Sequence, residues 1–311
     1  MTGPLRPLDH SIRVPLSHKK VADIASPNAS TQAPPLQEQD QYQISQPQLP
    51  QCPPLELAPP TYYDAAQDNE ARQAYYQLPT GWQNQNGAWV CEKLNQLLSQ
   101  THRPLEYNPT QFLYPVVEKR PDGQLYCVYG NDGSLQSQLT LDKIDCEHVV
   151  PQTWFRKDFV PKGDLHHLYA SFKNTNRTRG NAKYAEFTAQ GGSKQGFERS
   201  PGGVTDSAKN IFAPYAGKGE VARASLYFLL RYPGEVASSN GDFPDFDLPL
   251  LLKWHQEEPP TDHERHRNLE IQQRQGNRNP CIDYPELVPK VVQQLQTLAT
   301  SPNHWLLGPG F

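Results

Sequence analysis

Residues suited to acid–base chemistry first come together at residues 145–151, which read DCEHVVP. A histidine titrates near neutral pH, so an imidazole beside a carboxylate suits proton transfer. Neighbouring side chains on a strand point to opposite faces, so Glu147 and His148 share one substrate where the strand bends or ends. Pro151 favours such an end because proline cannot donate to a β-ladder. The alternative is a Glu-His pair on the surface at a strand end.

Asparagines and arginines crowd residues 174–181, which read NTNRTRGN and follow the GDLHHL stretch at 163–168. Asn is a poor residue for a helix interior, so its repetition here calls for a reason. One reason is a helix start that supplies an amide oxygen to a hard cation and guanidinium groups to a phosphate. The alternative is a nucleic-acid-binding loop without a metal.

The elements that must position these residues are short strands followed by helices. A strand is predicted within 141–150. An Asp-Gly pair at 122–123 predicts a hairpin with strands at 112–118 and 125–129. Helices are predicted over 65–76, 88–101, 219–232, 248–255, 263–275 and 286–300. This order indicates an α+β fold, with a small antiparallel sheet packed against a mostly helical lobe.

Composition divides the chain into two unlike parts. The sequence has 311 residues, of which 36% are hydrophobic, and a mean hydropathy of −0.75. Twelve of its 31 prolines precede residue 61, in a segment that is also rich in Gln. Such a segment cannot bury enough apolar area to offset the entropy of ordering it. We therefore expect a disordered tail over residues 1–60, as a linker or as a recognition or export segment, and a folded domain over 61–311.

Charge, apolar runs and cysteines exclude several classes of protein. No stretch approaches the roughly 18 apolar residues that span a bilayer. The net charge of −4 argues against a bulk polycation such as a chromatin protein. The five cysteines include no CxxC pair, which argues against a zinc ribbon, and up to two disulfides remain open among the four that follow residue 61. No Sec-type signal peptide is evident, so we expect synthesis in the cytoplasm. Any export or injection of the protein would then use a route other than Sec.

Four blocks of sequence, in the same order, resemble the endonuclease I family. They are DCEHVVP with Trp154-Phe155, GDLHHL with Asn176 and RGN at 179–181, GKGEVARASLYFLLRY at 217–232, and a block over 251–280 that ends in QGNRNP. Members of that family are non-specific nucleases with a ββα-metal finger, also called a His-Me finger. The resemblance covers roughly residues 61–300. It implies a nuclease domain over 61–311 with the finger at about 141–185.

The resemblance implies a role for each residue that matches the family's motif. His148 matches the general base that activates water for in-line attack on the scissile phosphate. Glu147 and Asn176 match the ligands of a single divalent cation, which we expect to be Mg²⁺, with Mn²⁺ or Ca²⁺ able to substitute. The implied reaction hydrolyses DNA, with RNA as a second candidate substrate, to 5′-phosphate and 3′-hydroxyl ends without strong sequence preference.

Other residues of these blocks are predicted to bind phosphate or to support the finger. Arg179 is a candidate second catalytic residue, as a phosphate clamp; its alternative is a salt bridge that holds the finger helix. Backbone contacts to nucleic acid are expected from Lys173, Arg177 and Arg156. Supporting roles are expected for Asp164, His166 and Asn181. A zinc site on His166 and His167 is disfavoured because adjacent histidines rarely converge on one ion.

Two interpretations of the function differ in class. The first is an active nuclease, and the second is a catalytically inactive nucleic-acid-binding module, which the intact set of Glu147, His148 and Asn176 disfavours. A nuclease that degrades any DNA must be kept from its host's genome. We therefore also expect a toxin effector whose tail over 1–60 binds a delivery apparatus or chaperone, with an inhibitor or immunity protein as a further partner. We expect a monomer that does not bind membranes.

Overall fold

The computed structural model describes residues 63–130, 141–155, 159–187, 197–236 and 246–300. They belong to one compact unit, which spans Leu49–Phe311. The tail predicted over residues 1–60 and the predicted contact residue Arg156 lie outside the described residues, and both stay predictions. Within the described ranges, no helix is long and apolar enough to cross a bilayer.

The fold is α+β, as the sequence predicts. The longer helices are α1 (Ala65–Tyr75), α2 (Gly87–Thr101), α5 (Lys218–Arg231), α6 (Leu248–Glu257), α7 (Asp262–Gln275) and α9 (Val288–Thr300). Short helical segments are η1 (Trp82–Asn84), η2 (Leu113–Val117), η3 (Leu141–Lys143), α3 (Phe159–Lys162), η4 (Leu165–His167), α4 (Lys173–Arg179), α8 (Pro280–Asp283) and η5 (Pro285–Leu287). The strands are β1 (Ile144–His148), β2 (Leu168–Phe172), β3 (Lys183–Tyr184), β4 (Phe197–Ser200), β5 (Gly203–Asp206) and β6 (Ile211–Pro214). The predicted helices and the strand within 141–150 are confirmed.

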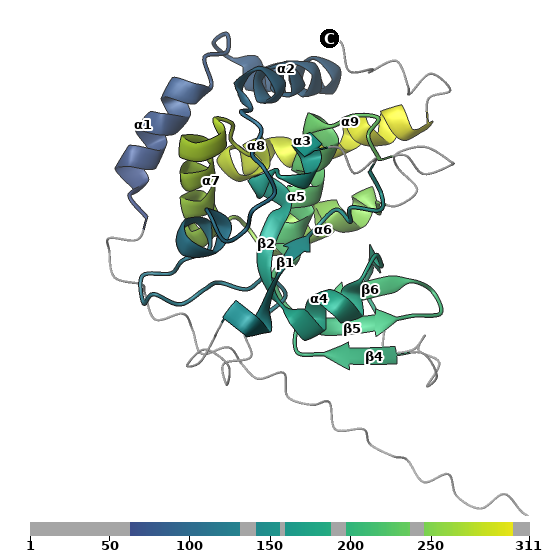
Figure 1. Cartoon of the computed structure of the whole chain (residues 1–311). Helices are drawn as coiled ribbons and strands as arrows, with labels where there is room; N and C mark the ends of the chain where they lie inside the picture. Colours follow the sequence, from purple (N-terminus) through teal and green to yellow (C-terminus); the bar gives the residue numbers. More distant parts are fainter. Residues whose placement is uncertain (1–62, 131–140, 156–158, 188–196, 237–245, 301–311) are drawn as a thin grey trace, which may run out of the picture. The chain divides into compact units, whose positions relative to one another are not determined.

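Strands β1 and β2 and helix α4 form a ββα unit within residues 141–185 (Figure 1). The two strands pair antiparallel, with Glu147 opposite Tyr169 and His148 opposite Leu168, and the chain passes from β2 directly into α4. One face of the pair packs on an apolar cluster that includes Ile144 and Cys146. Because side chains alternate along a strand, residues 145 and 147 face the other way.

A second sheet lies beside α4, with strand order β3-β6-β5-β4. Strands β4, β5 and β6 pair antiparallel, and the two-residue β3 adds to β6 in parallel. Helix α4 packs against β4 and β5 on one side and against β1 and β2 on the other (Figure 1). The finger helix is therefore held between two sheets.

Helix α5 is the centre of the helical lobe and is buried from Gly219 to Leu230. A helix that is buried on every side belongs to a core, and α5 packs against α2, α6 and the η4 segment that precedes β2. The charged Arg223 inside it forms a bidentate ion pair with Glu264 of α7, with contacts of 2.6 and 2.8 Å. Such pairing is what permits a guanidinium in a protein interior.

The polar residues of the last two motif blocks, 217–232 and 251–280, form a buried structural network. Its members are fully buried: Arg223, Arg267, Asn268, Asn277 and Arg278. Arg267 donates to Glu118 and to the carbonyl oxygens of Leu165 and Leu168, which ties α7 to the start of β2. Asn277, whose carbonyl oxygen lies 3.2 Å from His166 Nε2, makes a second such connection, while Arg223, Asn268 and Arg278 bond within the helical lobe.

The hairpin predicted at 112–129 is wrong in its strands and confirmed in its turn. Residues Leu113–Val117 form one wide helical turn, not a strand, and a single antiparallel bridge joins Lys119 to Leu125 across the turn. Pro115 lies in the middle of the first predicted strand and has no N–H for a ladder. The Asp-Gly signal therefore located the turn, while proline prevented strands on its first side.

Gly276 ends α7 in the left-handed region, at φ = +87°, where a Cβ would lie 2.3 Å from the carbonyl oxygen of Thr101. Gly123 has nearly the same conformation, φ = +79°, with no atom within 4 Å of its Cβ position. Alanine at either site incurs about 1–2 kcal/mol of backbone strain. We expect G276A to lose roughly a further 1–3 kcal/mol from the clash, measured by urea denaturation with G123A as the control. Equal losses in the two variants would contradict this.

Candidate active site

Glu147 lies buried between β1 and α4, with 1% of its surface exposed. Its Oε1 accepts hydrogen bonds from Tyr129 Oη at 2.5 Å and from Arg179 Nη1 at 2.8 Å. Within the described part of the chain, no donor lies within hydrogen-bonding distance of its other oxygen, Oε2. Burial raises the pKa of Glu147, and the nearby Arg179 and the hydrogen bond from Tyr129 oppose that shift. One carboxylate oxygen is therefore engaged, and the other is available.

Arg179 crosses from α4 to the end of β1 and is 2% exposed. Its guanidinium donates to the Glu147 carboxylate, to His148 O at 2.8 Å and to Val149 O at 2.7 Å. It also lies over the ring of Tyr184, 4.9 Å from the centroid. These contacts are those of the salt-bridge alternative, which holds the finger helix onto β1. The guanidinium is not presented to solvent as a phosphate clamp would require.

Asn176 lies one turn before Arg179 on α4, so both side chains face β1. Its amide nitrogen donates to Asp145 Oδ2 at 3.0 Å and to the carbonyl oxygen of Cys146 at 3.3 Å. These bonds turn the amide oxygen away from the strand, and no described residue donates to it. The structure thus brings the Asn176 oxygen and Glu147 to the same α4–β1 interface.

His148 is the last residue of β1, as the argument for a strand end predicts, and its ring lies on the opposite face from Glu147. The ring Nε2 lies 3.1 Å from the carbonyl oxygen of Lys162, and Nδ1 lies 3.2 Å from the amide nitrogen of Gln152. Since a carbonyl can only accept and an amide N–H can only donate, these partners assign the proton to Nε2. Burial, together with the neighbouring His167, lowers the pKa of His148 to about 3, so the imidazole is neutral at pH 7.

The predicted nucleic-acid and supporting residues divide into exposed and buried groups. Lys173 and Arg177 are exposed on α4, and Asn181 is exposed just after it. His166 is buried, and its Nε2 lies 3.2 Å from Asn277 O, which is the contact of a core histidine. No group of three or more His, Cys, Asp or Glu side chains that could hold a metal occurs in the described ranges.

A comparison with protein families identifies this arrangement. The model of the endonuclease I family matches residues 71–286, which include the whole finger and most of the helical lobe. The chain belongs to the endonuclease I family.

Two curated relatives are each named extracellular ribonuclease. This chain is 32% identical to the one from Bacillus subtilis (strain 168) over 143 residues. It is 34% identical to the one from Bacillus amyloliquefaciens over 138 residues. Each alignment covers 40% of this chain and 45% of the relative. The matched region thus spans about half the length of the curated relatives.

In this endonuclease I member, Asp164 connects the finger to the helical lobe. Its carboxylate is fully buried and accepts from Tyr227 Oη at 2.7 Å, Tyr232 Oη at 2.8 Å and Gln275 Nε2 at 2.7 Å. It also accepts from the backbone N–H of His166 at 3.0 Å, which caps η4. The supporting position predicted for Asp164 is therefore one of hydrogen bonding across three elements.

Sequence reasoning missed Tyr129, Tyr184 and Gln152, which contact the site directly. Gln152 follows the EHVVP motif and faces Nδ1 of His148. Tyr129 lies 18 residues before Glu147 and adopts φ = +78°, which is uncommon for a residue other than glycine. Neither tyrosine stands in a motif block, so no pattern in the sequence marks either one.

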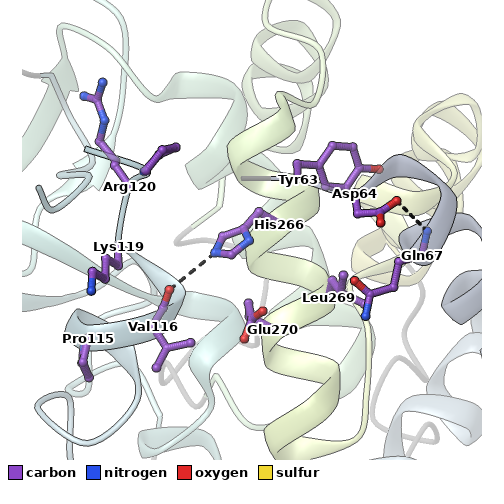
Figure 2. A pocket seen from close by; sticks show the side chains of 11 residues that line it. Tyr63, Asp64, Gln67, Pro115, Val116, Lys119, Arg120, His266, Leu269 and Glu270 are labelled. Carbon is purple, nitrogen blue, oxygen red and sulfur yellow. Dashed lines mark hydrogen bonds between the residues drawn. The ribbon is translucent and has the colours of Figure 1, made fainter. Parts of the chain in front are cut away.

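An open pocket of about 440 Å³ lies elsewhere, between the start of α1, the η2 turn and α7 (Figure 2). Its lining mixes both signs of charge, with Lys119 and Arg120 on one side and Asp64 and Glu270 on the other. None of the predicted site residues lines it.

The four cysteines in the described part of the chain are free thiols: Cys91, Cys127, Cys146 and Cys281.

Proposed function

We propose that the protein is a metal-dependent endonuclease that hydrolyses phosphodiester bonds in nucleic acids. The observation that carries the proposal is the α4–β1 contact in the ββα unit of an endonuclease I member, where Arg179 bonds to Glu147 and the Asn176 amide bonds to Asp145 and Cys146. These bonds leave Glu147 Oε2 and Asn176 Oδ1 as the candidate metal ligands. Hard oxygen donors of this kind are the ligands that Mg²⁺ prefers. When bound, the cation would stabilise negative charge on the phosphate during attack and departure.

His148 supplies the base in this proposal. The carbonyl of Lys162 fixes the proton on Nε2, which leaves the lone pair of Nδ1 to take a proton from water. The Gln152 amide occupies that lone pair in the structure, so water must displace it. A neutral imidazole at pH 7 is in the correct protonation state for this step. The water oxygen forms a bond to phosphorus, the bond from phosphorus to the 3′ oxygen breaks, and that oxygen takes up a proton, which gives 5′-phosphate and 3′-hydroxyl ends.

Exposed cations on α4 support binding to the nucleic acid backbone. Lys173 and Arg177 project from the same short helix that carries Asn176. Contacts to phosphate position a nucleic acid without reading its sequence, so we propose cleavage without strong sequence preference. The proposed substrates are DNA and RNA, and RNA gains support from the names of the two Bacillus relatives.

The biological setting is proposed from composition alone. The Pro/Gln-rich segment over 1–60 would be a tether or a delivery segment of a toxin effector, attached to a monomeric nuclease domain over 61–311. An inhibitor protein would then be the expected partner in the producing cell.

Cleavage with and without metal tests the proposal. Supercoiled plasmid and a single-stranded RNA are incubated with Mg²⁺, Mn²⁺, Ca²⁺ or EDTA, and nicking and fragment lengths are measured on gels. We expect EDTA to abolish cleavage. Unchanged cleavage in EDTA would contradict metal dependence, and tight binding without cleavage under every condition would favour an inactive nucleic-acid-binding module.

Asn176→Ala tests the ligand pair. Loss of the amide oxygen is expected to raise the Mg²⁺ concentration for half-maximal cleavage by at least about tenfold. Asn174→Ala is the matched control, because it removes the same group from an exposed position on α4. An equal metal requirement in both variants would show that Asn176 is not a ligand.

A further inference from the structure

The phenol of Tyr129 is the middle member of a buried chain of hydrogen bonds that runs from Tyr184 to Glu147. Tyr129 is fully buried, and its hydroxyl lies 2.5 Å from Glu147 Oε1 and 2.6 Å from the hydroxyl of Tyr184. A carboxylate can only accept, so Tyr129 donates to Glu147 and is free to accept the proton of Tyr184. Hydrogen bonds linked in this way in a low-dielectric interior polarise one another.

The backbone of Tyr129 is held in an unfavourable conformation to make this contact. A non-glycine residue at φ = +78° carries strain of about 1–3 kcal/mol, which persists only where the surroundings enforce it. Two glycines close around the residue: a Cβ on Gly202 would lie 2.9 Å from Tyr129 Cβ, and one on Gly217 would lie 3.2 Å from Tyr129 N. Phe212 packs edge-on against the ring at 5.0 Å. Such strain clusters at functional sites.

The contact decides which oxygen of Glu147 is available. Tyr129, which precedes β1 in the chain, and Arg179 of α4 both donate to Oε1, and together they fix the rotation of the carboxylate. A carboxylate held by one oxygen can bind a cation through the other, without the cost of ordering the side chain on binding.

We propose that Tyr129, backed by Tyr184, is a positioning residue that holds Glu147 in its metal-binding rotamer and leaves Oε2 to the cation. This inference rests on the proposed function, because it takes Glu147 as a metal ligand. It adds to that function two residues outside every motif block of the sequence, which orient the Glu147 carboxylate through hydrogen bonds.

The helical lobe contains a matched arrangement that serves as a control. Tyr76 donates its phenol to Asp283 Oδ2 at 2.8 Å, and Arg278 forms an ion pair with the same carboxylate. Tyr76 and its carboxylate partner are buried, as are Tyr129 and Glu147. Tyr76→Phe therefore removes the same group from the same chemical setting, away from the finger.

Direct binding of Mn²⁺ to the full chain, followed by electron paramagnetic resonance of the free ion, tests the inference without reference to cleavage. Tyr129→Phe is expected to weaken Mn²⁺ binding by about 10–100-fold, the usual effect of losing a partner of a ligand. Tyr76→Phe is expected to bind Mn²⁺ as the parent does. Thermal denaturation of both variants separates loss of folding from loss of binding. Parental Mn²⁺ affinity in folded Tyr129→Phe would overturn the inference.

Two further variants keep the outcomes distinct. Tyr184→Phe removes the hydroxyl that lies 2.6 Å from Tyr129 Oη, and with it a longer contact to Val149 O at 3.4 Å. We expect Mn²⁺ to bind about fivefold more weakly, the equivalent of one buried hydrogen bond. This variant decides the question if Tyr129→Phe does not fold, since parental affinity in Tyr184→Phe would then overturn the inference.

Glu147→Gln tests the proposed function itself: Mn²⁺ binding equal to that of the parent would contradict the metal site and, with it, the inference. Weak binding by Glu147→Gln beside parental binding by Tyr129→Phe would refute the inference alone.

Discussion

Replacing His148 with alanine is expected to lower the kcat of nucleic acid cleavage by about 10²–10⁴-fold, the usual contribution of a general base. Mn²⁺ binding should stay at the parental level, because the imidazole lies on the opposite face of β1 from Glu147 and its hydrogen-bond partners are Lys162 and Gln152. This separation of cleavage from metal binding distinguishes a base from a ligand. Single-turnover cleavage at saturating Mg²⁺ measures the first quantity, and Mn²⁺ titration measures the second.

His255→Ala is the control for loss of a buried imidazole. His148 and His255 are each 6% exposed, and the Nε2 of each lies near a backbone carbonyl, at 3.1 Å from Lys162 O and 3.0 Å from Pro285 O. His255 belongs to α6 and has no proposed part in catalysis. We expect its variant to keep the parental kcat while it loses stability. If the two variants cleave equally fast, the base is another group, and the metal site remains to be judged by Asn176→Ala.

The chemical residues of the finger could be predicted because the family's motif fixes their types and order. The expected strand at 141–150 and the asparagine-rich helix after GDLHHL became β1 and α4, and the Asn176 amide bonds to β1 at Cys146 O, next to Glu147. The opposite facing of Glu147 and His148 also follows from strand geometry, because neighbours alternate. The motif does not specify the hydrogen-bond partners of each side chain.

Arg179 and Tyr129 show why the other contacts of the site could not be predicted from the sequence. The same arginine could bind a phosphate or a buried carboxylate, and the choice depends on whether α4 is covered, which the second sheet decides. Tyr129 reaches Glu147 through a left-handed backbone that Gly202 and Gly217 permit from far along the chain. Contacts of that kind depend on tertiary packing, and no local period or spacing encodes them.

Replacing Asp164 with asparagine is expected to lower the free energy of unfolding by about 3–5 kcal/mol, as for other buried charge networks that lose one member. Both carboxylate oxygens accept hydrogen bonds, from Tyr227 and Tyr232 on Oδ2 and from Gln275 on Oδ1. An amide must turn its NH₂ group toward some of these donors, which leaves buried hydroxyl or amide groups unpaired. Urea denaturation measures the loss. Asp64→Asn is the control, because Asp64 caps α1 at an exposed position and asparagine caps equally well.

The pH dependence of this loss identifies its cause. Burial alone would raise the pKa of Asp164, but the nearby His102, His166 and His167 and the hydrogen bond from Gln275 outweigh it and hold the pKa well below its usual range. A group whose pKa is depressed by folding stabilises the native state above its unfolded pKa, and this stabilisation disappears as the pH falls toward the folded value. The loss of unfolding free energy in Asp164→Asn should therefore be complete at pH 7 and shrink below about pH 4, the ordinary pKa of aspartate. A deficit that is constant from pH 7 to pH 3 would assign it to altered packing instead of the lost carboxylate charge.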